Sequence, residues 1–110
     1  MLNEVKMACR VTATAYDSEL VGLIKAGAKD LQVAGINLGG DINITISSTG
    51  AVNDYSTVTD PIVQRAIITY VRMNFGTPVD YDRLAESYIM QKTQLMYASG
   101  YTNYGGDPND

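Results

Sequence analysis

The sequence predicts a mainly α-helical fold: one four-helix, bundle-like domain over residues 1–98, with an arm between the second and third helices and a C-terminal tail over residues 99–110. Three observations favour this fold. The chain has 110 residues, the usual length of a single domain. Apolar residues recur at three- and four-residue steps in four segments, which is typical of amphipathic helices. Acidic residues, prolines and glycines flank those segments, where helices begin and end.

The first two helices are expected over residues 4–10 and 18–34. Asp17 and Ser18 can cap the free amides at the start of the second helix. The apolar side of this helix consists of Leu20, Val21, Ile24, Ala28 and Leu31. Gly35 can take the left-handed conformation that ends a helix.

Residues 36–59 contain few helix-forming residues and are expected to form the arm, as a long loop or a short β-hairpin. Ile42, Ile44 and Ile46 alternate with polar residues, which is the period of a β-strand. A lone hairpin is only marginally stable in water, so its apolar side needs the helices or a neighbouring subunit. We therefore take these three isoleucines as candidate subunit contacts.

The third helix is expected over residues 61–75. Asp60 can cap it, and Pro61 suits its first position because the amide that proline lacks would have no partner there. Apolar residues cover more than one side of this helix: Ile62, Val63, Ala66, Ile67, Ile68, Tyr70, Val71, Met73 and Phe75. Such a helix is buried on most sides, so we expect it to be the central one.

The fourth helix is expected to begin after Asp80 or Asp82 and to run to about Ala98, with Gly100 after it. Its apolar side comprises Tyr81, Leu84, Ala85, Tyr88, Leu95 and Met96, and Arg83, Glu86 and Lys92 lie opposite. The tail that follows is polar, acidic and rich in glycine, so we expect it to be flexible until a partner binds it.

Three tyrosines lie where the last helix gives way to the tail: Tyr97, Tyr101 and Tyr104. Large aromatic residues with a polar tip are common in protein interfaces. We therefore expect these tyrosines either to dock a partner or simply to pack at the edge of the domain.

The composition disfavours several functional classes. Eight basic residues against twelve acidic ones give a net charge of −4, the wrong sign for tight nucleic-acid binding. The sequence has no histidine, the commonest general base and metal ligand. The single Cys9 cannot form an internal disulfide and indicates a reducing compartment. Neither a secretory signal nor a membrane-spanning run is expected.

No short motif in the sequence indicates a catalytic or metal-binding site. Oxygen-bearing side chains fall at alternate positions, as in calcium loops, at Asp41, Asn43, Thr45 and Ser47. However, Ile46 stands where such a loop needs glycine and Val52 where it needs glutamate. We expect no catalytic, cofactor-binding or metal-binding residue, and hence no enzyme.

Two blocks carry a family resemblance. They are EVKMACRVTATAYDSELVGLIKAGAKDL, residues 4–31, and TDPIVQRAIITYVRMNFGTPVDYDRLAESYIMQKTQL, residues 59–95. Their order and patterns resemble the head-tail connector (adaptor, head completion) proteins of tailed bacteriophages. Gly27 departs from that pattern, since a second alanine is common there, and the middle segment does not align.

The resemblance implies a structural virion protein, made in the host cytoplasm and located in the neck. It implies a ring, usually a dodecamer, beneath the portal protein and in contact with tail or head-completion proteins. DNA would pass through the ring without sequence-specific binding, and neither a membrane nor a cofactor is implied.

The alternative is a small helical phage protein that regulates transcription or inhibits a host enzyme. Binding DNA would require a basic recognition helix, and the third helix offers only Arg65 and Arg72 among apolar residues.

Overall fold

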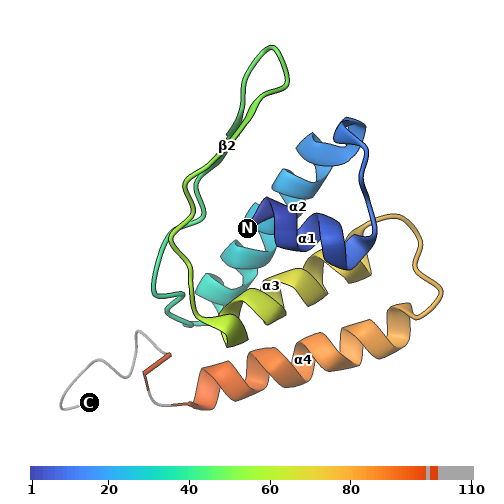
Figure 1. Ribbon diagram of the computed structural model, residues 1–110. Coiled ribbons are helices and arrows are strands. Elements are labelled where there is room, and N and C mark those ends of the chain that lie inside the picture. The colour runs from blue at the N-terminus through green and yellow to red at the C-terminus, as the bar shows by residue number, and fades with distance from the viewer. Residues whose placement is uncertain (99, 102–110) are drawn as a thin grey trace.

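Helices make up most of the chain in the computed structural model, which describes residues 1–98, 100 and 101 (Figure 1). Their bounds are α1 Leu2–Cys9, η1 Thr14–Tyr16 (a 3-10 turn), α2 Asp17–Val33, α3 Pro61–Asn74 and α4 Tyr81–Tyr97. A two-stranded antiparallel sheet, β1 Ile44–Ile46 and β2 Val52–Asp54, lies between α2 and α3. This confirms the mainly helical fold and the hairpin in the arm.

The central element is α3, which packs against α1, α2 and α4 (Figure 1). Its buried residues are Val63, Ala66, Ile67, Thr69 and Val71. Asp60 caps the helix as predicted, because its carboxylate accepts hydrogen bonds from the backbone N–H groups of Ile62, at 2.8 Å, and Val63, at 3.5 Å. Ile62 and Arg72 face solvent, so α3 is central but not buried on all sides.

The start of α2 differs from the prediction. Asp17 lies inside the helix, and no side chain caps the helix start. Its carboxylate instead accepts a hydrogen bond from Lys6 Nζ at 2.6 Å, in a largely buried ion pair that joins α1 to α2. Because Asp17 is the first residue inside α2 and its side chain bonds Lys6 instead of a free backbone N–H group, the predicted capping role was wrong. Asp80 likewise precedes α4 without capping it, and its carboxylate pairs with Arg83.

Gly27 is explained by the packing of α2 on α3. A Cβ atom at this position would lie 2.9 Å from Cδ1 of the Tyr70 ring, closer than real Cβ atoms approach their neighbours. The Tyr70 ring also meets the edge of the Tyr88 ring, with 5.5 Å between ring centroids. The glycine therefore makes room for an aromatic pair that links α2, α3 and α4.

Asp30 ties α2 to α4. Its carboxylate accepts hydrogen bonds from the Tyr88 hydroxyl and from Lys92 Nζ, the latter at 3.1 Å. Burial opposes ionisation of Asp30, but these two hydrogen bonds outweigh it and hold its pKa below the usual value. Burial is the largest cause of the raised pKa of Tyr88, and the hydrogen bond to Asp30 is the second largest. The sequence pattern had placed Lys92 opposite the apolar side of α4. That prediction was wrong, because Lys92 pairs with Asp30 of α2.

Candidate assembly surfaces

The hairpin arm projects from the helical body (Figure 1). Its strands pair in the register Ile44↔Asp54, Thr45↔Asn53 and Ile46↔Val52. The backbone at Ser47 and Ala51 closes the turn with a 2.8 Å hydrogen bond, and Gly50 takes a left-handed conformation with φ of 89°. The tip, residues 47–51, is exposed and is the part of the arm farthest from the helices.

Two contacts fix the base of the arm. The carboxylate of Asp54 accepts a 2.9 Å hydrogen bond from the Leu2 backbone N–H and a 2.7 Å one from the Met1 amino group, which joins β2 to α1. The backbone at Gly40 runs so close to Thr57 that a Cβ atom would lie 2.4 Å from the Thr57 carbonyl oxygen. The arm is therefore held in one position where it leaves the body.

Replacing Asp54 by Asn is expected to destabilise the protein by about 1 to 3 kcal/mol at neutral pH, since hydrogen bonds to a charged group are lost. Burial opposes ionisation of Asp54, but hydrogen bonds outweigh it and lower its pKa below the usual value. A depressed pKa contributes stability that is present above about pH 4 and is lost as the pH falls further. The free energy of unfolding, measured with urea between pH 7 and pH 2, should therefore fall less steeply in the variant than in the wild type. An equally steep fall would contradict the contact.

The candidate subunit contacts Ile42, Ile44 and Ile46 share one side of the arm, but they are not equally available. Ile44 is 1% exposed and belongs to the core of this chain. Ile42 and Ile46 are half-buried and pack at the edge of that core. Of the two partners that the sequence left open for this apolar side, Ile44 therefore packs in the core of its own chain. The contact of the arm with a neighbouring subunit stays a prediction for the exposed tip and the two outer isoleucines.

The candidate docking tyrosines also differ from one another. Tyr97, the last residue of α4, is 83% exposed. Tyr101 is half-buried: its hydroxyl donates a 2.7 Å hydrogen bond to Asp60 Oδ2, and its carbonyl accepts one from the Asn37 backbone N–H. Tyr101 thus packs against its own chain and is not a free anchor. Tyr104 and most of the predicted flexible tail, residues 99 and 102–110, lie outside the described residues.

Replacing Tyr101 by Phe is expected to remove the hydrogen bond that holds the end of the described chain against α3. That bond is the largest cause of the lowered pKa of Asp60. Since the folded-state pKa lies below the usual value, the bond stabilises the fold above about pH 4 and is lost on further acidification. The variant should show a higher Asp60 pKa by NMR titration and faster amide exchange at Asn37. An unchanged Asp60 pKa would refute the contact.

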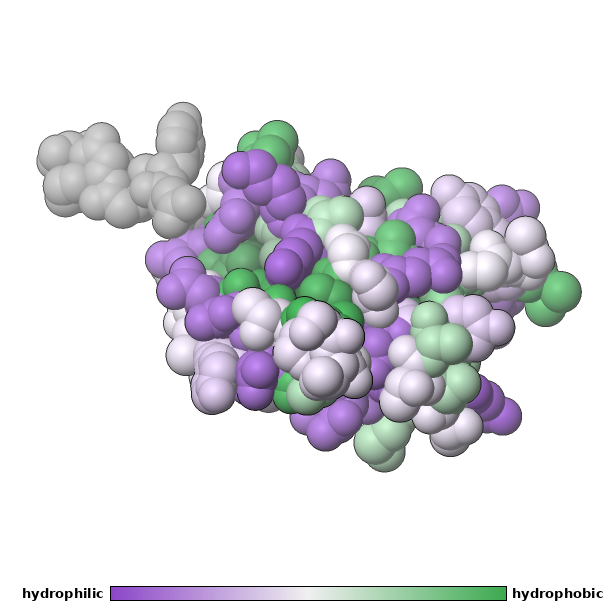
Figure 2. All heavy atoms as spheres, turned by 90° about the horizontal axis from the view of Figure 1, so that it is seen from above, coloured by the Kyte–Doolittle hydropathy of each residue, from purple (hydrophilic) through white to green (hydrophobic). Residues whose placement is uncertain are grey.

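The sequence pattern did not single out the outer side of α4. Ile89 is 60% exposed and Met90 64% exposed, and Tyr97 lies two turns beyond Ile89 on the same side. We call Ile89, Met90 and Tyr97 the α4 outer patch. They lie across the helix from the buried residues of α4, which are Leu84, Tyr88 and Leu95. The sequence did contain a signal for this patch, because large apolar residues opposite an apolar stripe indicate an interface. By contrast, apolar residues on the face shown in Figure 2 are scattered among hydrophilic ones.

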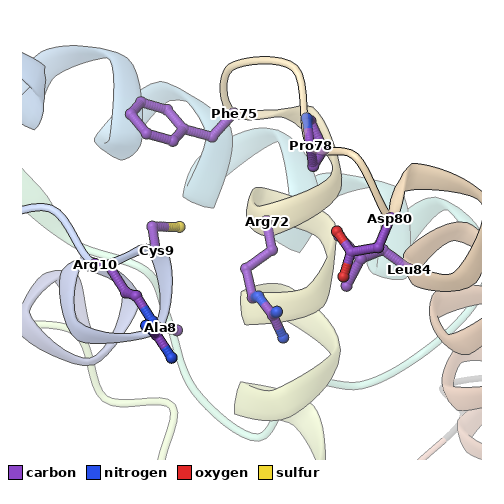
Figure 3. Close-up of a pocket in the computed structure, with 8 residues that line it drawn as sticks. All are labelled: Ala8, Cys9, Arg10, Arg72, Phe75, Pro78, Asp80 and Leu84. Carbon is purple, nitrogen blue, oxygen red and sulfur yellow. The ribbon is translucent and has the colours of Figure 1, made fainter.

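A pocket of about 230 Å³ lies where α1 ends, α3 ends and α4 begins. Its lining residues are Ala8, Cys9, Arg10, Arg72, Phe75, Pro78, Asp80 and Leu84 (Figure 3). Burial raises the pKa of the Cys9 thiol, and the positive charge of Arg72 opposes this only partly. A protonated thiol is a weaker nucleophile than a thiolate. We call it the arginine pocket.

Among the described residues, no group of three histidine, cysteine, aspartate or glutamate side chains could hold a metal ion. Within residues 1–98, 100 and 101, no helix is both long and apolar enough to cross a membrane. What the described chain does offer is a projecting arm, an apolar patch and a charged pocket, which are features of protein contacts.

Comparison with known proteins identifies the family. The family model described as phage connector protein matches residues 1–102, which include every element described above and the segment that could not be aligned from the sequence pattern. No curated protein and no solved structure gives a significant match. The match favours the connector resemblance over a regulatory or inhibitory protein. The chain therefore belongs to the phage connector protein family and has a connector-type structural role in the virion.

Proposed function

We propose that this protein is a head-tail connector that assembles as a dodecameric ring beneath the portal and extends the DNA channel toward the tail. The observation that carries the proposal is the family match over residues 1–102, which includes both the helical body and the arm. Its partners would be neighbouring copies, the portal protein and the tail or head-completion proteins.

The shape of the chain supports assembly through several surfaces. Its principal extents are 49 × 32 × 19 Å, and the arm extends away from the helices (Figure 1). A ring subunit needs at least two different contact surfaces, because each copy meets one neighbour on each side. The arm tip, the α4 outer patch and the arginine pocket provide candidates for those contacts and for docking to the portal.

The charge of the chain suits a conduit for DNA. A lining rich in lysine and arginine would bind the phosphates and hold the DNA in place, whereas a net charge of −4 lets a polyanion pass. DNA would therefore move through the ring without sequence-specific contacts.

The proposal is tested by a phage in which the gene for this chain carries a nonsense mutation. We expect electron microscopy to show heads and tails that fail to join, with joining restored when the wild-type protein is supplied. A nonsense mutant that releases complete, infectious particles would overturn the proposal.

A further inference from the structure

We infer that neighbouring copies of this chain join head to tail, with the acidic outer side of α4 in one copy bound against the arginine pocket of the next. The inference rests on the proposed function, because it assigns the interface between subunits of the proposed ring. The inference is carried by a pair of arginines, a pair of carboxylates and the apolar residues beside each pair.

The arginine pair is Arg10, which follows α1, and Arg72, which lies on α3. Both side chains are exposed and extend toward the same side of the pocket (Figure 3). Neither forms an ion pair with a described residue. Asp80 also lines the pocket, but its carboxylate pairs with Arg83 at 3.3 Å. Because a guanidinium group binds carboxylates through two parallel hydrogen bonds, the two arginines suit carboxylates from outside the chain.

The carboxylate pair is Asp82 and Glu86, one helical turn apart on α4. Both are exposed, and neither forms an ion pair with a residue that the structure describes. Like charges four residues apart on a helix repel each other. A pair of arginines from another copy would relieve that repulsion and match the charge of the pair.

Apolar residues lie beside both charged pairs. The α4 outer patch continues from the carboxylates toward the end of the helix, since a period of 3.6 residues places Ile89 and Tyr97 on the side of Asp82 and Glu86. On the other surface Met7 is 79% exposed and lines a groove that Arg10 also borders. Apolar area would supply most of the affinity, and the charges would set the orientation, because exposed ion pairs alone contribute little.

The two surfaces face different directions on one chain. Leu84 lines the arginine pocket, whereas the helical period places Asp82 and Glu86 on the opposite side of α4. One copy therefore cannot satisfy its own arginines with these carboxylates. A contact between two different surfaces repeats from copy to copy and closes into a ring when the rotation between neighbours allows it.

The test uses two charge-reversed variants of the full chain. The pocket variant carries Arg10→Glu and Arg72→Glu, and the helix variant carries Asp82→Arg and Glu86→Arg. Each alone places like charges across the interface, so we expect association at least about tenfold weaker than wild type. An equimolar mixture should assemble again, because each variant then finds opposite charge in the other. A chain with all four substitutions should assemble by itself.

The measurement is particle mass by light scattering, at a concentration where the wild type assembles, with portal particles added if the free chain stays monomeric. Melting curves check that each variant folds, and a Lys29→Glu, Arg65→Glu chain, with the same net charge as the pocket variant, should assemble normally.

Normal assembly of either variant alone, or failure of the mixture to assemble, would overturn the inference. Rescue of the pocket variant only by a chain with Asp107→Lys and Asp110→Lys would overturn it too, since the occupant would then be the C-terminal segment. A wild-type chain that neither assembles nor binds portal would count against the proposed function itself, and the interface would fall with it.

Discussion

Replacing Ile67 by Asp is expected to unfold the protein. Ile67 is completely buried in α3, the helix against which α1, α2 and α4 all pack. An unpaired buried charge costs several kcal/mol, against a total stability of about 5 to 15 kcal/mol for a domain of this kind. Circular dichroism at 25 °C should show loss of cooperative melting in the variant.

The same helix offers a matched control. Ile62 is 48% exposed and lies in the first turn of α3, where a negative charge is favourable. Ile62→Asp should therefore melt within a few degrees of the wild type. A folded Ile67→Asp chain with an unchanged melting temperature would contradict the central position of α3.

Replacing Ile44 by Ser should free the arm from the helical body. Removing a buried isoleucine side chain costs about 2 to 5 kcal/mol, and the serine hydroxyl would add the cost of burying a polar group. Because Ile44 is the one fully buried residue of β1 and β2, the loss should appear locally: faster amide exchange and faster protease cleavage in residues 41–57, with the helices still folded.

Ile46 serves as the comparison for Ile44. It lies on the same side of β1 but is only half-buried, so Ile46→Ser should have a clearly smaller effect on exchange in the free chain. If Ile46→Ser leaves the free chain intact yet weakens assembly, the outer part of the arm contacts a neighbouring subunit. Equal exchange in the two variants would contradict the burial of Ile44 in its own core.

The helices of this protein could be predicted because local signals determine them. Asp60 and Pro61 mark the start of α3 in the sequence and do so in the structure. Gly35 and Gly76 take left-handed conformations after α2 and α3, as expected for residues that end helices. The alternation of isoleucines likewise predicted the strand at Ile44–Ile46.

Side-chain partners far apart in the sequence could not be predicted in the same way. Asp17 seemed a cap because only its neighbours are visible in a sequence, whereas its partner Lys6 comes from another helix. Lys92 seemed solvated for the same reason, although it pairs with Asp30 on α2. Tyr101 seemed free, yet Asp60 binds its hydroxyl. Such pairs depend on how helices cross, which helical periodicity does not determine.

The same contrast between local signals and partners far apart in the sequence applies to the candidate assembly surfaces. The α4 outer patch could be predicted from the helical periodicity, since Ile89 and Met90 fall opposite the buried residues of α4. The arginine pocket could not be found from the sequence, because Arg10 and Arg72 are brought together only by the packing of α1 on α3.

The central claim is that this chain forms a ring on the portal, and the mass of the complex with portal tests it most directly. Purified portal particles, incubated with an excess of the chain and separated from unbound protein, should be weighed by native mass spectrometry. The account predicts one discrete complex whose added mass corresponds to a closed ring, a dodecamer on a twelve-fold portal. A portal that gains no mass, or gains a continuous distribution of copies, would contradict it.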